Sequence, residues 1–94
     1  MTERGIFSFR LFVAGDAPNS AQALSNLTAL CDRFLPGRYE IEVVDVYRDA
    51  ARALAEGIFM TPTLVRLCPG AVLKVVGSLS NSETVVAALG LVAA

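Results

Sequence analysis

The amino-acid sequence predicts one α/β domain in which the chain runs strand, helix, strand, helix, strand, strand, helix. Segments with apolar residues at every second position alternate with segments in which they recur every three or four positions. The first strand segment is apolar at every second position and Phe12 fills its second face near the end, as is typical of a strand buried largely on both sides. The length of 94 residues fits a single small domain. We therefore expect residues 1–94 to form one folding unit.

Composition excludes several classes of protein. Hydrophobic residues make up 54% of the chain and charged residues 18%, which is incompatible with a disordered chain. The net charge of -1 lacks the basic excess of a nucleic-acid or membrane-surface binder. The longest uncharged apolar stretch, residues 84–94, is too short for a spanning helix, which needs about 20 residues. We expect a cytoplasmic protein that binds neither nucleic acid nor membrane.

The first half of the chain predicts a parallel strand-helix-strand unit. In residues 7–13, alternate positions are apolar: Phe7, Phe9, Leu11 and Val13. Asp16 is the expected N-cap of the following helix and Pro18 lies in its first turn. One face of that helix carries Leu24, Leu27, Cys31 and Phe34, and Pro36-Gly37 ends it. Alternating residues 39–46 predict the second strand, parallel to the first.

The second half predicts a helix, two strands and a last helix. Residues 49–56 are rich in alanine, with Asp49 as a possible cap and Gly57 as the end. Residues 63–67 and 71–76 predict two strands on either side of a turn at Cys68-Pro69-Gly70. Ser80, Asn81 or Ser82 is expected to cap the last helix.

This order of elements is the thioredoxin-like arrangement, in which enzymes carry their thiols just after the first strand. The helix N-terminus lowers the pKa of a thiol there. Here the four residues are Asp16-Ala-Pro-Asn19, so dithiol chemistry is absent at the usual site. Pro62, which opens the third strand, is the kind of proline that is usually cis in this arrangement and faces the first loop.

Other candidate chemistry is sparse. There is no histidine, which removes serine–histidine and cysteine–histidine nucleophiles and most catalytic zinc sites. Cys31 lies on an apolar helix face and is expected to be a buried hydrophobe, whereas Cys68 beside a turn is expected to be more exposed. Glu40 and Glu42 are expected on a solvated strand face. We expect no enzymatic activity, no metal and no cofactor. The alternative is a thiol or redox-sensing protein that acts through Cys68.

Four segments, in this order, resemble the KaiB family of circadian clock proteins. They are FRLFVAGDAPNS at residues 9–20, the strand at residues 39–46, TPTL at residues 61–64 and GSLSN at residues 77–81. The resemblance implies a non-enzymatic adaptor that binds the ATPase ring of KaiC, helps to sequester KaiA, or communicates with a sensor histidine kinase. It also implies a metamorphic protein, with a tetrameric ground state and a thioredoxin-like monomer that binds KaiC.

Departures from the family pattern bear on the balance between these two folds. Ala88 replaces a glycine in the last predicted helix, which favours the helix by up to about 1 kcal/mol, and Gly90 is expected to oppose it near its end. The proline run of the family is reduced to Pro69. With Pro62, these residues are our candidates for setting the fold. We predict a monomer that rests mainly in the thioredoxin-like form, with the tetramer as the alternative.

The candidate partner surface combines the second helix, the loops that adjoin it and nearby strands. Its predicted residues are Tyr47, Arg48, Arg52, Glu56, Arg66 and Lys74. Gln22, Gly57 and Leu73 stand where the family often has basic residues, so the resemblance allows weaker KaiC binding or a different partner. An adaptor for a kinase or ATPase outside any clock therefore stays open as a third hypothesis.

Overall fold

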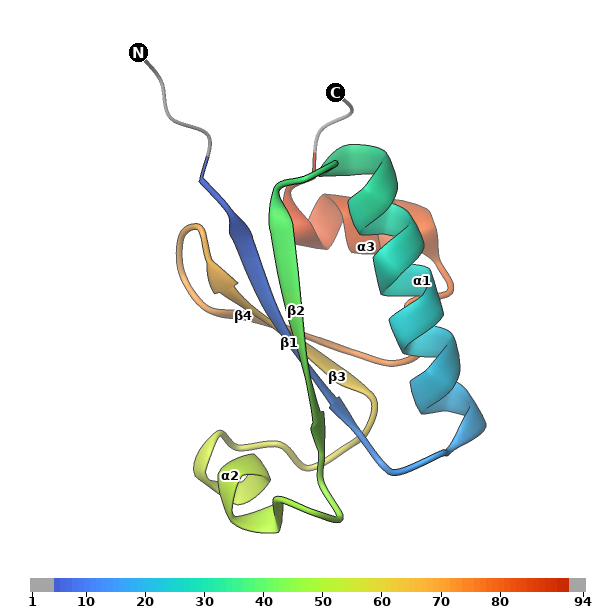
Figure 1. The fold of residues 1–94 in the computed structure, drawn as a ribbon, viewed down its shortest axis with the longest axis vertical. Coiled ribbons are helices and arrows are strands. Elements are labelled where there is room, and N and C mark those ends of the chain that lie inside the picture. Colours follow the sequence, from blue (N-terminus) through green and yellow to red (C-terminus); the bar gives the residue numbers. More distant parts are fainter. Residues whose placement is uncertain (1–4, 92–94) are drawn as a thin grey trace.

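A four-stranded sheet with strand order β2-β1-β3-β4 organises the fold, in a computed structural model that describes residues 5–91 (Figure 1). The elements are β1 (Phe7–Val13), α1 (Pro18–Phe34), β2 (Tyr39–Asp45), α2 (Ala50–Ala55), β3 (Thr63–Cys68), β4 (Leu73–Val76) and α3 (Ser82–Leu89). Their order is the one predicted from the sequence.

β1 is an interior strand, as its two-faced apolar pattern predicts. It pairs in parallel with β2 from Phe7–Tyr39 to Val13–Asp45. On its other side it pairs antiparallel with β3, and β3 pairs antiparallel with β4. β2 and β4 are therefore the edges of the sheet.

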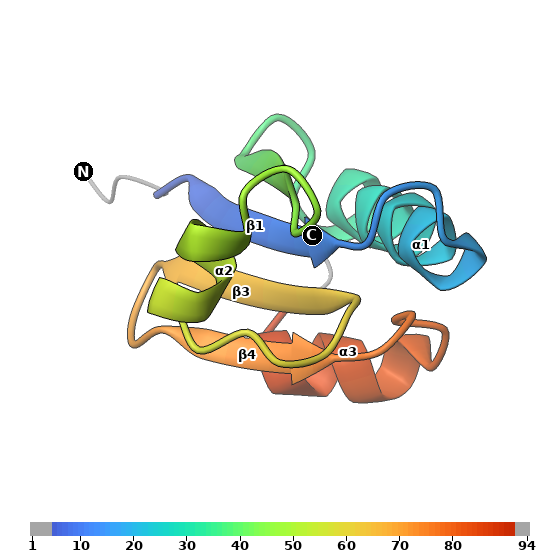
Figure 2. The same ribbon diagram turned by 90° about the horizontal axis from the view of Figure 1, so that it is seen from below.

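The two faces of the sheet are covered unequally. Figures 1 and 2 show α1 and α3 on one side of the sheet and the short α2 on the other, near one end. The α1 and α3 side holds the main core, which includes Phe9, Leu11, Leu27, Leu64 and Leu89. The α2 side holds a smaller second core, formed by Phe12, Val44, Ala53, Ile58 and Val65.

The start of α1 differs from the prediction. Ala17, and not Asp16, is the N-cap residue, and no side chain caps the helix. Pro18 occupies the first turn, as predicted. The hydroxyl of Ser20 instead accepts a hydrogen bond from the Ala14 amide at 3.1 Å. A side chain inside the helix therefore accepts a hydrogen bond from the backbone amide that directly follows β1, while Asp16 stays exposed.

The other predicted boundaries hold with small shifts. Asp49 occupies the N-cap position of α2, but its side chain makes no capping bond. Asn81 caps α3, its Oδ1 accepting from the Thr84 amide at 3.2 Å. β4 begins at Leu73 rather than residue 71, because the turn that contains Gly70, at φ 82°, extends further.

The candidate fold-setting residues take defined places. Thr61–Pro62 and Cys68–Pro69 are both cis peptide bonds. Ala88 lies inside α3 and is exposed. Gly90 ends α3 in the left-handed conformation, at φ 69°, where glycine is favoured, so the expectation that it opposes the helix is wrong.

Within residues 5–91, none of the helices has the length and hydropathy needed to cross a bilayer.

We predict that Leu27→Ala lowers the free energy of unfolding by about 2–5 kcal/mol, because Leu27 is completely buried in the main core. Leu54→Ala, which truncates the same side chain on the exposed side of α2, is expected to change it by less than about 0.5 kcal/mol. Urea denaturation of both variants measures the difference. Equal losses would contradict the assignment of the core.

Candidate partner-binding surface

The side chains predicted to bind a partner do not all lie together. Tyr47 and Arg48 lie on the segment that leads into α2, and Arg52 and Glu56 belong to α2 and its C-cap. Lys74 on β4 reaches the same region, where its Nζ donates to the carbonyl of Glu56 at 2.7 Å. This part of the predicted grouping agrees with the structure.

Arg66 does not belong to this group. It neighbours Val65 on β3, and successive side chains of a strand point to opposite faces of the sheet. Because Val65 faces the second core, Arg66 faces α3. Its guanidinium donates to the carbonyls of Leu89, at 2.9 Å, and Ala71, at 3.1 Å. The prediction that placed Arg66 beside α2 is therefore wrong in geometry.

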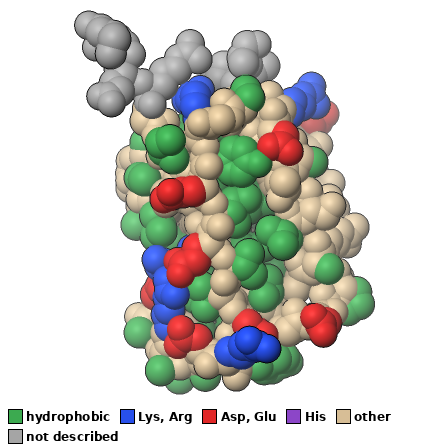
Figure 3. All heavy atoms as spheres, in the orientation of Figure 1, with side chains coloured by type: hydrophobic (Ala, Val, Ile, Leu, Met, Phe, Trp, Pro, Cys, Tyr) green, Lys and Arg blue, Asp and Glu red, His purple; other side chains and the backbone are tan. Residues whose placement is uncertain are grey.

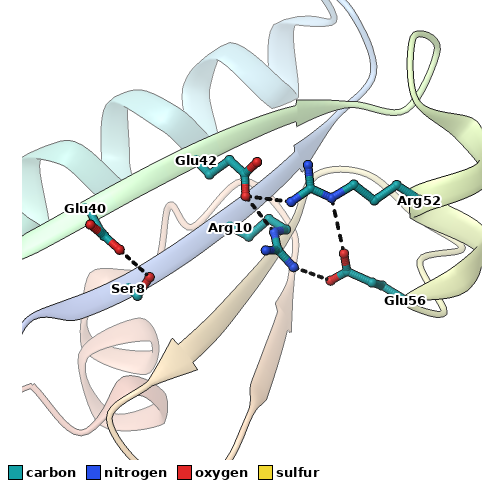
Figure 4. Close-up of polar contacts among 6 residues, drawn as sticks. All are labelled: Ser8, Arg10, Glu40, Glu42, Arg52 and Glu56. Carbon is teal, nitrogen blue, oxygen red and sulfur yellow. Dashed lines mark hydrogen bonds and ion pairs between the residues drawn. The ribbon is translucent and has the colours of Figure 1, made fainter.

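Arg52 and Glu56 belong to a closed ring of four alternating charges, drawn in Figure 4 and called here the charge ring. Its members are Arg10 of β1, Glu42 of β2, and Arg52 and Glu56 of α2 and its C-cap. The nitrogen–oxygen distances around it are 2.9 Å (Arg10–Glu42), 2.7 Å (Glu42–Arg52), 3.5 Å (Arg52–Glu56) and 2.8 Å (Glu56–Arg10). The ring ties α2 to the two strands beneath it.

Arg10 is the member of the charge ring that the sequence analysis missed. It is the one charged residue of β1, and its register partner on β2 is Glu42. A single arginine in a central strand, opposite a glutamate on the neighbouring strand, was the available signal. Recognising it required the register of the two strands, which the hydrophobic pattern alone does not specify.

Three members of the charge ring have pKa values that are shifted in favour of their charged forms. Hydrogen bonds from Arg52 and then Arg10 lower the pKa of Glu42 to about 2. The hydrogen bond with Glu42 is also the main cause that raises the pKa of Arg10 and of Arg52. Basic and acidic side chains lie side by side at the lower left of Figure 3, the region of α2 in Figure 1. Because their charges are matched within the protein, they offer little net charge to a partner.

Arg48 is different, because among residues 5–91 its guanidinium takes part in no ion pair. It is exposed and lies beside Asp45, Asp49 and Arg52 around a shallow hollow of about 380 Å³. Of the predicted arginines near α2, Arg48 is therefore the one whose charge is free to pair with a carboxylate of another protein.

Exposed apolar side chains gather at the end of the sheet next to α2. Tyr47, Phe59 and Met60, called here the apolar end patch, are 77%, 84% and 65% exposed. They line a hollow of about 240 Å³ together with Ala14, Val46, Ile58 and Thr61. Only Tyr47 was predicted. The signal for the other two was the run of three apolar residues, 58–60, between Gly57 and Thr61, which fits neither the helix nor the strand spacing.

Asp45 fixes the position of Tyr47. Its Oδ1 accepts from the amide of Tyr47, at 2.9 Å, and from the amide of Gly15, at 3.1 Å. One carboxylate therefore ties the loop after β2 to the loop after β1. Gly15 has φ 54°, and a Cβ there would lie 3.3 Å from the Tyr47 ring, so a glycine suits this close approach.

The two cysteines lie as predicted, one buried and one exposed. Cys31 is buried, and desolvation raises the pKa of its thiol to about 12, with a smaller contribution from Asp32. Cys68 is exposed, and its Sγ lies 3.6 Å from the carbonyl of Ile6. In the described part of the chain, no three histidine, cysteine or acidic side chains are grouped so that they could hold a metal.

Comparison with known proteins decides the family. A family model described as the KaiB domain matches residues 10–91. This chain belongs to the KaiB family. The resemblance found in the four sequence segments is thereby confirmed.

Curated KaiB relatives match nearly the whole chain. The circadian clock oscillator protein KaiB of Gloeothece citriformis is 37% identical over 90 residues, covering 96% of this chain and 85% of the relative. The circadian clock protein KaiB3 of Synechocystis is 35% identical over 83 residues, covering 88% and 81%. These KaiB proteins are clock proteins by name, which supports a clock role for this member.

Solved structures confirm the thioredoxin-like fold. The N-terminal domain of SasA from Synechococcus elongatus matches with a TM-score of 0.65 and 20% identity, over 89% of this chain and 80% of that one. Mitochondrial thioredoxin 3 of Saccharomyces cerevisiae matches with a TM-score of 0.71 and 17% identity, over 94% and 81%. At these identities the likeness concerns the fold alone.

The charge ring predicts how stability depends on pH. Since the pKa of Glu42 falls from 4.5 to about 2 on folding, its contribution is complete above pH 4.5 and is lost as the pH falls towards 2. We therefore expect the difference in unfolding free energy between the wild type and Glu42→Gln to shrink over this interval, as measured by urea denaturation at a series of pH values.

Glu40→Gln is the matched control. It removes the same charge two residues away on β2, where the glutamate accepts a hydrogen bond from Ser8 rather than from an arginine. A difference between wild type and Glu42→Gln that stays constant from pH 5 to pH 2, or that Glu40→Gln reproduces, would contradict the role given to the charge ring.

Proposed function

We propose that this KaiB-family protein is a non-enzymatic adaptor that binds a KaiC-like ATPase ring through the α2 end of its sheet. The observation that carries the proposal is the apolar end patch, which leaves two large aromatic side chains and a methionine exposed. Aromatic residues, methionine and arginine are enriched in protein interfaces, and a few such residues supply most of the binding energy. Arg48 directly follows Tyr47 of the patch, and among residues 5–91 it takes part in no ion pair.

The fold supports this proposal because it retains the loop and the helix start that carry the thiols of a thioredoxin, but has no cysteine there. The loop that follows β1 and the first turn of α1 present Asp16, Pro18 and Asn19 to solvent, and no cysteine lies there. Asp45 holds that loop against Tyr47. The region that performs thiol chemistry in an enzyme of this fold therefore supports a surface for binding another protein.

A second surface supports binding of a further protein, for which KaiA or a sensor histidine kinase is the candidate. β2 is an edge strand, so one side of its backbone lacks a neighbouring strand. Beside it, an apolar hollow of about 290 Å³ is lined by residues that include Val43, Leu24 and Ala21. Hydrophobic side chains are visible between β2 and α1 in Figure 3. An extended segment of a partner could add to this edge.

We further propose that the chain works as a monomer in the thioredoxin-like form. Ala88 is exposed within α3, so its higher helix propensity favours α3 by up to about 1 kcal/mol over the glycine common in the family. Asn81 and Gly90 cap the two ends of the same helix. A bias of this size shifts an equilibrium between two folds about fivefold.

Co-elution with ATP-loaded KaiC from the same organism tests the adaptor function. The wild type is expected to form a complex on a sizing column and to run as a monomer alone. Phe59→Ala is expected to weaken the complex by at least about tenfold, because it removes the most exposed aromatic of the apolar end patch.

Val72→Ala is the matched control, since Val72 is also an exposed apolar residue but lies in the turn between β3 and β4, at the other end of these strands. Equal losses from Phe59→Ala and Val72→Ala would contradict the proposed surface. A monomer that forms no complex with KaiC would contradict KaiC binding and turn the search to other ATPases and to kinases.

The alternative function, thiol or redox sensing, rests on the exposure of Cys68. It requires thiol reactivity that Cys68→Ser abolishes. The adaptor proposal expects Cys68→Ser to bind KaiC as the wild type does, because Cys68 lies at the end of β3 away from α2.

A further inference from the structure

Few apolar contacts attach residues 46–61, called here the α2 segment, to the rest of the protein. Ala53 and Ile58 are its buried apolar side chains, and both belong to the second core. Val46 is partly buried against the same core, and the remaining large apolar residues, including Leu54 and Phe59, are exposed. α2 itself has six residues, too few to remain helical without tertiary contacts. Hydrophobic burial therefore holds this segment much less firmly than it holds α1.

Hydrogen bonds to backbone atoms join the two ends of the segment to its neighbours, whereas charged side chains supply the polar attachments of α2 and its C-cap to the sheet. Glu42 and Arg10 of the sheet bind Arg52 and Glu56 of the α2 segment through the charge ring. Lys74 of β4 adds a hydrogen bond to the Glu56 carbonyl. The side chains of the ring remain between 20% and 47% exposed, so dissolved salt screens them. Each charge has partners on two sides, so the loss of one member disturbs the whole ring.

We propose that the charge ring is a latch that keeps the α2 segment on the sheet, and that this segment opens as one unit while the main core stays folded. The sheet separates the second core from the main core, so opening leaves the contacts between the sheet and α1 and α3 intact. It uncovers Phe12 and Val65 on the sheet and displaces the apolar end patch, which the same segment carries. Ionic strength would then regulate how the patch is presented. The proposal concerns the isolated chain and does not depend on the identity of any partner.

Amide hydrogen exchange of the full chain, followed by NMR at neutral pH, tests the latch. The reporters are the amides of Ala53, Glu56 and Ile58, which donate to carbonyls within the α2 segment. Raising the salt concentration from about 0.01 M to about 1 M is expected to speed their exchange about five- to thirtyfold, while the amides of β1 and β3 still exchange far more slowly than the reporters. Glu42→Gln at low salt is expected to produce the same acceleration.

Glu40→Gln is again the control, because it removes a neighbouring carboxylate outside the charge ring. Three results would overturn the proposal: reporter amides that exchange as slowly as those of β1, reporter rates that ignore salt, or equal acceleration by Glu40→Gln and Glu42→Gln. The salt series on the wild type decides the matter even if Glu42→Gln does not fold.

Discussion

The placement of β1 between β2 and β3 is the constraint on which the rest of the structure depends. Successive side chains of a strand point to opposite faces, so the order of residues along β1 assigns each to one side of the sheet. Leu11 enters the main core, Phe12 enters the second core, and Arg10 meets Glu42 on the face that α2 covers. A shift of the register by one residue would exchange these environments and bury the arginine.

The unequal faces of the sheet explain where binding and mobility are expected. The main core, with two helices packed over it, supplies a rigid support. The opposite face has one short helix, held by a small apolar cluster and matched charges. The proposed partner surface lies on this less strongly held side, next to loops that Asp45 ties together. A protein that must recognise another protein can thus adjust one end of its sheet without loosening the other.

Much of the fold was predictable because it follows from hydrophobic periodicity and from turn residues. The strands and α1 follow from the spacing of apolar residues such as Leu11 and Leu27. The site was less predictable, since its parts depend on tertiary geometry. Arg10 joins the charge ring only through the register of β1 with β2, and Arg66 turns away from α2 because of its place on β3. Phe59 and Met60 lie in a loop, where hydrophobic periodicity does not predict which side chains are exposed. Asp16 failed as a cap because the helix begins one residue later than expected.

The account as a whole rests on the chain holding this arrangement in solution, with β4 paired to β3 and the following segment helical. Backbone chemical shifts and cross-strand nuclear Overhauser contacts measure this most directly. The account predicts strand shifts for Leu73–Val76, contacts between β3 and β4 at Leu64–Val75, and helical shifts for Ser82–Leu89. Helical shifts at Leu73–Val76, together with an extended conformation at Ser82–Leu89, would contradict it.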